Sequence, residues 1–147
     1  MPSRHLLDAE IAYSQSGKLE KGDRMIPYAK STTVYVRDQQ RAVDFWVNKM
    51  GFEKRTDLPM GPDARWIEVA PPGAQTVLVP YTPPGLESRV GTFSGIVFDC
   101  DDIQATYKEL RKRGVEFTEE PAQQPWGLQA QFKDSEGNGY VLVQSKE

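Results

Sequence analysis

Residues 31–37 are β-branched and aromatic, which is typical of a β-strand. The pattern then changes to helical spacing, because apolar residues recur at positions 42, 45, 46 and 50. Asp38 stands where a helix N-cap belongs, and Gly51 stands where a helix ends in the left-handed conformation. Further strands are predicted at 52–56, 65–70 and 75–82, the last two around a turn at 71–74. The predicted order is one strand, one helix and three strands.

The same order of patterns returns later in the chain. Asp102 is placed as a second N-cap, 64 positions after Asp38, and Gly114 follows Gly51 by 63 positions. The second set of predicted elements is a strand at 94–100, a helix from 103 and strands at 115–118, 129–133 and 140–144. An internal duplication of this length predicts two βαβββ modules, which is an α+β fold.

The two modules account for residues 29–147, which we expect to form a single domain of ordinary size. Module one is predicted at 29–86 and module two at 93–145. Residues 1–28 precede the pattern and are interpreted as an N-terminal extension or leader. Within them, residues 3–13 have the spacing of one short amphipathic helix.

Side chains alternate along a strand, so one face of each sheet is expected to pack on its helix while the other lines a concave cup. This alternation gives the cup aliphatic walls with a few polar points, and it places aromatic residues near the rim. Such a composition is typical of small-molecule sites. The predicted ligand-binding residues are Thr33, Tyr35, Trp66, Val79, Tyr81, Val97, Asp99, Trp126 and Val141.

Three of these residues have more than one interpretation. Asp99 is the one charge among the aliphatic walls, and it is a candidate general base or a counter-charge for a cationic ligand. Otherwise it is a solvated carboxylate that bonds to a neighbouring strand. Tyr35 is a second catalytic candidate or a packing residue. Trp126 fits either a ligand contact or a cover for a sheet edge.

The duplicated pattern resembles the vicinal oxygen chelate superfamily, which holds glyoxalase I, extradiol dioxygenases and bleomycin-resistance proteins. The resemblance covers residues 29–145 and rests on VYVRDQQRAVDFW (34–46), GFE (51–53), 96–117 and 125–144. It implies the fold of two βαβββ modules. In members that perform chemistry, one His or Glu from each of four strands holds a divalent metal. Carried onto this sequence, the four ligand positions fall on Ser31, Val79, Gly95 and Val141.

These four residues form a poor set of metal ligands. Valine and glycine offer no donor side chain, and a serine hydroxyl is a weak ligand for the metals of this superfamily. We therefore expect no metal cofactor.

Residues 124–127 (Gln-Pro-Trp-Gly) add a narrower resemblance. They are similar to the tryptophan–glycine element that bleomycin-resistance proteins carry before a turn, here at Asp134–Gly137. Those relatives have no metal of their own and bind a drug in a groove between two subunits. The resemblance implies a homodimer that binds an aromatic or cationic compound, such as an antibiotic.

Charge and composition limit the classes of partner that the sequence predicts. The 18 basic and 21 acidic residues give a net charge of −3, which predicts no binding to nucleic acid. No apolar run approaches the roughly 20 residues of a membrane helix. The single cysteine, Cys100, excludes an internal disulfide and favours a cytoplasmic location. The single histidine, His5, lies in the extension, so no Ser–His or Cys–His pair is expected within the domain.

Three functions follow from these observations. The first is a metal-free, cytoplasmic, homodimeric protein that binds or sequesters a small molecule. The second is a glyoxalase- or dioxygenase-like enzyme, a lyase or isomerase, with Asp99 or Tyr35 transferring a proton. The third is an interaction module whose cup is empty and collapsed.

Overall fold

The computed structural model describes residues 24–145, and the chain divides into two units, 1–30 and 31–147. The short helix predicted at 3–13 and the histidine at position 5 lie outside the described residues. Every helix and strand that the structure describes belongs to the second unit. Within residues 24–145, no helix has the length and apolar character needed to cross a membrane.

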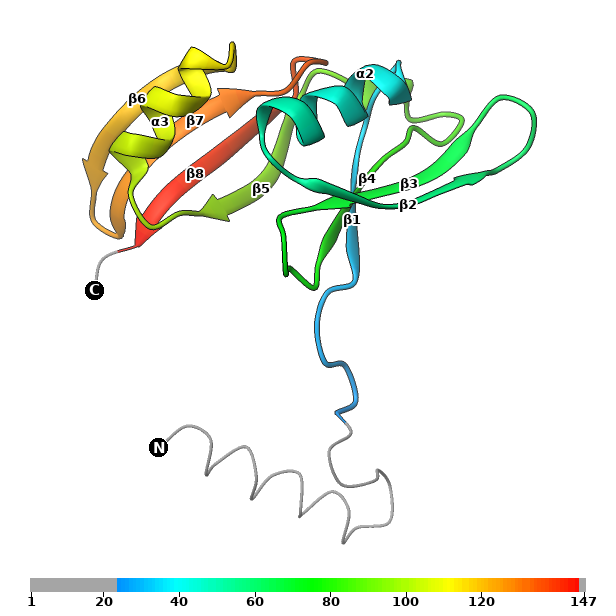
Figure 1. Cartoon of the computed structure of the whole chain (residues 1–147), viewed down its shortest axis with the longest axis horizontal. Helices are drawn as coiled ribbons and strands as arrows, with labels where there is room; N and C mark the ends of the chain where they lie inside the picture. The colour runs from blue at the N-terminus through cyan, green and yellow to red at the C-terminus, as the bar shows by residue number, and fades with distance from the viewer. Residues whose placement is uncertain (1–23, 146–147) are drawn as a thin grey trace, which may run out of the picture. The chain divides into compact units, whose positions relative to one another are not determined.

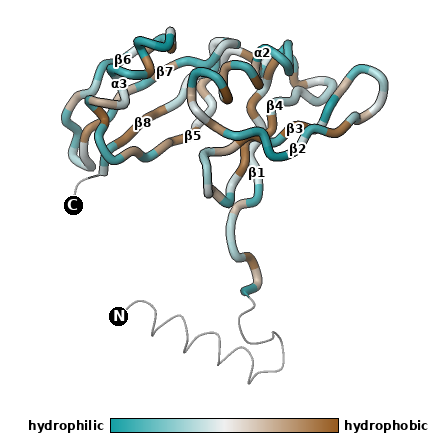
Figure 2. The backbone as a smooth tube through the Cα atoms, in the orientation of Figure 1, coloured by the Kyte–Doolittle hydropathy of each residue, from teal (hydrophilic) through white to brown (hydrophobic). Residues whose placement is uncertain are grey.

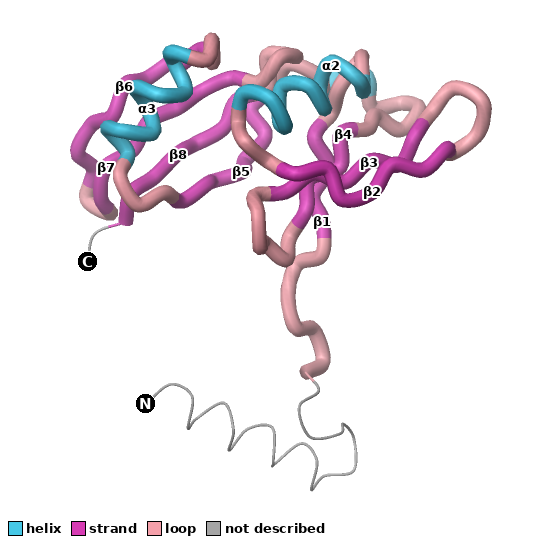
Figure 3. Tube along the Cα trace, in the orientation of Figure 1, coloured by secondary structure: helices cyan, strands magenta, loops and turns pink. Residues whose placement is uncertain are grey.

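Module one forms a four-stranded sheet in the order β1-β4-β3-β2 (Figures 1 and 3). Strand β1 runs parallel to β4, and the other neighbours are antiparallel. A short 3₁₀ helix, η2 (Glu87–Arg89), follows the module. The elements of module one are β1 (Ser31–Val34), α2 (Gln39–Asp44), the π-helix η1 (Phe45–Lys49), β2 (Glu53–Pro59), β3 (Arg65–Ala70) and β4 (Val77–Pro80).

Module two repeats this topology with the strand order β5-β8-β7-β6. Strand β5 is parallel to β8, and the remaining pairs are antiparallel. The predicted duplication of a βαβββ unit is therefore confirmed. Its elements are β5 (Phe93–Asp99), α3 (Ile103–Lys112), β6 (Glu116–Gln124), β7 (Gly127–Lys133) and β8 (Gly139–Ser145).

The predicted caps delimit both helices. The carboxylate of Asp38 accepts from the backbone N–H of Arg41 at 3.0 Å, and that of Asp102 accepts from Ala105 at 3.1 Å. Gly51 and Gly114 have φ angles of 79° and 92°, the left-handed conformation in which glycine ends a helix without steric cost.

Several strand ends differ from the sequence-based prediction. Strand β1 ends at Val34 rather than at residue 37, because the backbone N–H and carbonyl of Val36 both bond to the Thr82 hydroxyl, each at 2.8 Å. Strands β6 and β7 are longer than predicted and reach Gln124 and Gly127. Trp126 consequently lies in a tight turn between two paired strands.

One hydrophobic core runs through both modules. Figure 2 shows hydrophobic residues along β4 and β8, one strand from each module. The fully buried Trp46 on η1 joins the two halves. Its ring centroid lies 5.1 Å from that of Tyr140 and 5.9 Å from that of Phe98, both in module two. These aromatic contacts fix the helix of module one against the sheet of module two.

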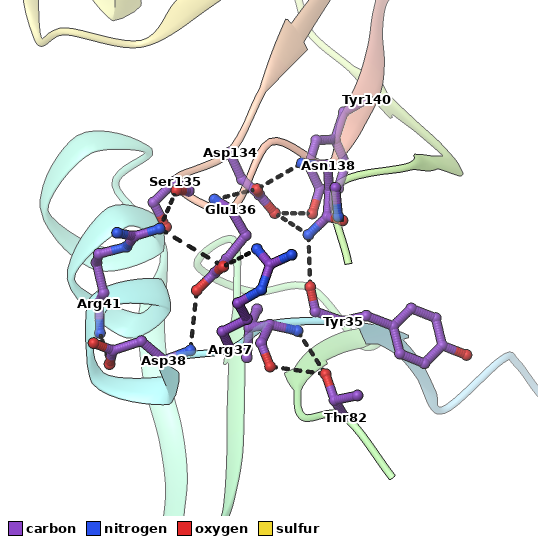
Figure 4. Close-up of polar contacts among 12 residues, drawn as sticks. Tyr35, Arg37, Asp38, Arg41, Thr82, Asp134, Ser135, Glu136, Asn138 and Tyr140 are labelled. Atoms are coloured by element: carbon purple, nitrogen blue, oxygen red, sulfur yellow. Dashed lines mark hydrogen bonds and ion pairs between the residues drawn. The ribbon is translucent and has the colours of Figure 1, made fainter. Parts of the chain in front are cut away.

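The turn between β7 and β8, residues 134–138, makes a second connection between the modules (Figure 4). The Asp134 carboxylate accepts from the Tyr140 hydroxyl at 2.5 Å and from the backbone N–H of Asn138 at 3.0 Å. The Asn138 amide then donates to the backbone carbonyl of Tyr35 in module one at 2.7 Å. The bonds to Asp134 therefore fix the shape of the turn, and the bond from Asn138 to Tyr35 connects the turn to module one.

Glu136 in the same turn carries a carboxylate that is only 1% exposed. It accepts from the backbone N–H of Asp38 at 3.0 Å, and it lies 3.7 Å from Arg37 and 3.6 Å from Arg41. A buried carboxylate requires partners of this kind, because removing a charge from water costs several kcal/mol. The junction therefore constrains both modules electrostatically as well as by packing.

Removing the Tyr140 hydroxyl tests the contribution of this turn. Burial and the Asp134 carboxylate raise the pKa of Tyr140 far above its usual value, so the hydroxyl stays protonated and donates. Tyr140→Phe keeps the ring but removes a buried hydrogen bond to a charged acceptor. We expect the free energy of unfolding in urea to fall by about 1.5–3 kcal/mol. Tyr107→Phe, whose hydroxyl accepts only an exposed bond from Arg111, should change it by less than about 0.5 kcal/mol. Equal losses of unfolding free energy in the two variants would contradict a stabilising role for the Tyr140 hydroxyl.

Asp57 on β2 gives a pH-dependent prediction. Hydrogen bonds from Arg65, at 2.6 and 3.0 Å, and from Lys54, at 2.9 Å, hold the pKa of Asp57 well below its usual range. Because the folded-state pKa is lowered, this stabilisation is present above about pH 4 and is lost as the pH falls toward the folded value. Asp57→Asn should therefore lose less stability than the wild type between about pH 4 and pH 2 in denaturant titrations. Asp63→Asn, at an exposed position, should follow the wild type; parallel losses in all three proteins would refute the prediction.

Candidate functional site

The face of each sheet opposite its helix, called here the cup face, carries the predicted site residues. Along β3, Ile67 and Val69 are fully buried in the core shared with the helices. Trp66, Glu68 and Ala70 alternate with them and point to the other side, as the two-residue period of a strand requires.

The cup face of module one has an apolar floor made of Ala70, Val77 and Val79. Val79 is only 1% exposed, because the half-buried rings of Trp66 and Tyr81 pack against this floor. The structure thus brings three of the predicted residues, Trp66, Val79 and Tyr81, into one cluster. Thr33 lies beside it, as the register partner of Val79.

Tyr35 lies one residue beyond the end of β1 and is half-buried. Its ring points away from the junction turn (Figure 4), and the Arg89 guanidinium lies over it, 5.0 Å from the ring centroid. Sequence reasoning missed Arg89, because η2 is a short connecting segment without a periodic pattern. Among the described residues, no hydrogen bond links Tyr35 to the other catalytic candidate, Asp99.

On module two, Val97 and Val141 are register partners on β5 and β8. Val141 is 8% exposed, whereas Val97 is 58% exposed. Asp99 is also exposed, and its carboxylate accepts a 3.4 Å bond from the Ser145 hydroxyl. In the single chain this corresponds to the interpretation of Asp99 as a solvated carboxylate bonded to the neighbouring strand, here β8.

Trp126 is 56% exposed in the turn between β6 and β7. Its indole N–H donates to the Gln129 side chain at 2.9 Å. Gln129 is the register partner of Val143, two residues from Val141 on β8, and therefore belongs to the cup face of module two. This bond anchors the indole on the side where the ligand is predicted.

A cavity of about 20 Å³ lies between elements of the two modules. Its lining includes Thr33 and Tyr35 from module one and Phe93 and Asn138 from module two. This volume corresponds to roughly one water molecule, whereas a drug-sized ligand needs about 300 Å³ or more. Within the described part of one chain, this cavity cannot hold such a ligand.

Large apolar side chains are exposed on the same faces. Leu58 is the register partner of Trp66, and Phe93 is the partner of Gly139 on the cup side of β5. Both are more than half exposed, as are Val97 and Trp126. Leu58 belongs to module one and the other three to module two, and large exposed apolar side chains of this kind are candidates for contact with a ligand or another chain.

The four family ligand positions do not fit a divalent metal. Val79 and Val141 are buried and aliphatic, and Ser31 offers one exposed hydroxyl. Gly95 has a φ of 77° within a register shift of β5, a conformation that a ligating residue with a side chain rarely adopts. Within residues 24–145, no three His, Cys, Asp or Glu side chains lie close enough to hold a metal ion.

Glu68 is a cup-face residue that sequence reasoning missed. One carboxylate oxygen accepts from the Thr56 hydroxyl at 3.0 Å, and the other accepts from the Trp66 indole N–H at 3.1 Å. The alternation of side chains along a strand could have identified Glu68. It lies two residues after Trp66 and therefore on the same face of β3.

Comparisons with known proteins agree with this architecture. The family model described as the Glyoxalase/Bleomycin resistance protein/Dioxygenase superfamily matches residues 29–142. The protein YetH of Bacillus subtilis (strain 168) is 47% identical over 118 residues, which cover 80% of this chain and 98% of YetH.

Two solved structures are similar. A superfamily member from Sphaerobacter thermophilus DSM 20745 has a TM-score of 0.76 and 42% identity, covering 83% of this chain and 100% of that one. TnmS3, an antibiotic binding protein from Streptomyces sp. CB03234, has a TM-score of 0.73 and 35% identity, covering 84% and 100%. The duplicated fold, the family match and these relatives show that the chain belongs to the glyoxalase/bleomycin-resistance/dioxygenase superfamily.

Proposed function

We propose that this protein binds a flat, largely apolar small molecule on its cup faces without transforming it. The observation that carries the proposal is the apolar floor of Ala70, Val77 and Val79, with the rings of Trp66 and Tyr81 beside it. Aromatic rings supply a large contact area at low cost in conformational entropy. The 35% identity to TnmS3, which is described as an antibiotic binding protein, favours an antibiotic-like compound.

A second copy of the chain completes the site in this proposal. The cavity at the junction is too small for a ligand, and Leu58, Phe93 and Trp126 leave apolar surface exposed on the cup faces. A homodimer that pairs the cup faces of two chains covers this surface and encloses the ligand. The third hypothesis, an interaction module with an empty, collapsed cup, predicts that no ligand binds.

Ligand binding is tested with a panel of aromatic antibiotics in a thermal unfolding assay. A true ligand at one hundred times its Kd stabilises the folded state by about 2.7 kcal/mol and raises the unfolding temperature. Trp66→Ala and Trp126→Ala should each weaken the binding about tenfold, because each removes a stacking surface. Tyr107→Phe, on α3 and away from the cup faces, serves as the control. If no compound stabilises the protein, or if the tryptophan variants bind as tightly as the wild type, the proposal fails.

We further propose that binding needs no metal ion, because the residues at the four family ligand positions provide no suitable donor set. Elemental analysis of the purified protein should find no stoichiometric nickel, zinc, iron or manganese. Treatment with EDTA should leave the unfolding midpoint and the ligand affinity unchanged. One metal ion per chain, removed by EDTA with loss of stability or affinity, would require a different site.

A further inference from the structure

Glu68 differs from the other acidic residues of its sheet in having no cationic partner among the described residues. Asp57 is paired with Arg65 and Lys54, and Glu53 is paired with Arg55. Glu68 instead accepts hydrogen bonds from two neutral groups, the Thr56 hydroxyl and the Trp66 indole. Its negative charge is therefore held in place without being neutralised.

The two hydrogen bonds orient this carboxylate on the cup face. Each oxygen has a second acceptor position, because an ionised carboxylate offers about four lone-pair sites. Glu68 shares the cup face of β3 with Trp66 and Ala70, and so lies between a stacking ring and the apolar floor. A charge beside apolar surface interacts more strongly with an opposite charge than the same charge does in bulk water.

The basic residues of this sheet have other partners, since Arg65 and Lys54 pair with Asp57 and Arg55 pairs with Glu53. The Arg55 guanidinium donates to the backbone carbonyls of Ala74 and Pro71 and lies 3.4 Å from the Glu53 carboxylate. A negatively charged ligand would therefore meet the uncompensated charge of Glu68 without a free cation beside it. A positively charged ligand would neutralise that charge and could also contact the face of the Trp66 ring through a cation–π interaction.

We propose that Glu68 is the counter-ion for a protonated amine carried by an aromatic ligand, whose ring stacks on Trp66 and Tyr81. This inference rests on the proposed function, since it names the ligand class of the same site. A hydroxyl and an ammonium group can both donate to the Glu68 carboxylate, but only the ammonium adds a Coulomb attraction between opposite charges. Glu68 thus selects aromatic amines over neutral and acidic aromatic compounds of the same shape.

The test uses three probes that share one ring: 1-naphthylmethylamine, 1-naphthylmethanol and 1-naphthoate. Binding is followed in ¹⁵N-labelled protein through the indole N–H resonance of Trp66, assigned with Trp66→Phe. This proton reports on the site directly, because it lies in the hydrogen bond to Glu68. We expect the amine to bind about tenfold more tightly than the alcohol, which corresponds to about 1.4 kcal/mol, and the naphthoate to bind most weakly.

Glu68→Gln removes the charge and keeps an acceptor for Thr56 or Trp66. We expect this variant to bind the amine about tenfold more weakly than the wild type does, and to bind the alcohol as the wild type does. Glu53→Gln is the matched control, since Glu53 is the register partner of Ala70 on the same sheet and already has a cationic partner. It should retain the preference for the amine, as should Glu68→Asp, which keeps the charge.

The outcomes separate this inference from the proposed function. Equal affinities for amine and alcohol in the wild type, or a preference that survives in Glu68→Gln, overturn the role of Glu68 while leaving an apolar binding site. If none of the probes shifts the Trp66 resonance, both proposals fail. A measurement that needs no variant is the salt dependence: added NaCl should weaken amine binding and leave alcohol binding unchanged. Equal salt dependence of the two would also overturn the inference.

Discussion

The packing of Trp46 between the two modules is the contact on which the rest of the structure depends. The indole is contributed by the helical segment of module one, and it meets the rings of Phe98 and Tyr140 on the sheet of module two. Its N–H has no hydrogen-bond partner among the described residues, which costs about 1–3 kcal/mol. The aromatic contacts on both sides of the junction must outweigh this cost. They bury the helix-facing sides of both sheets in a single core. The cup faces lie outside this core.

The polar turn at 134–138 gives this packing its orientation. Aromatic contacts tolerate small rotations, whereas the bonds from Asn138 to Tyr35 and from Asp38 to Glu136 hold only in one arrangement. The buried carboxylates of Asp134 and Glu136 are therefore structural, and each is supplied with donors from its own turn or from module one. Because Tyr35 and Asp38 lie in the segment that connects β1 to α2, the turn also positions the strand that borders the candidate site.

The cup faces show how a fold associated with metal chemistry can present a different surface. Where superfamily enzymes place charged or imidazole ligands, this chain has the aliphatic side chains of Val79 and Val141, and both are buried. Aliphatic groups cannot coordinate a cation, but they bury apolar surface well and support the rings of Trp66 and Tyr81. On the cup face of module one, hydrogen bonds from Thr56 and Trp66 hold the Glu68 carboxylate in place.

The sequence by itself determined the duplication, the helix ends and the alternation of the strands, because these depend on residues close together in the chain. Asp38, Asp102, Gly51 and Gly114 act locally, so their positions alone predicted both helices. Which strands form the sheet edges depends on pairing between segments that are far apart in the chain. The sequence left two interpretations of Asp99 open, and the pairing of distant segments decided that it is exposed on the edge strand β5. The stacking of Arg89 on Tyr35 and the unneutralised charge of Glu68 likewise arise only when separate segments meet. Local chemistry specified the elements, and tertiary packing decided which side chains are free to bind.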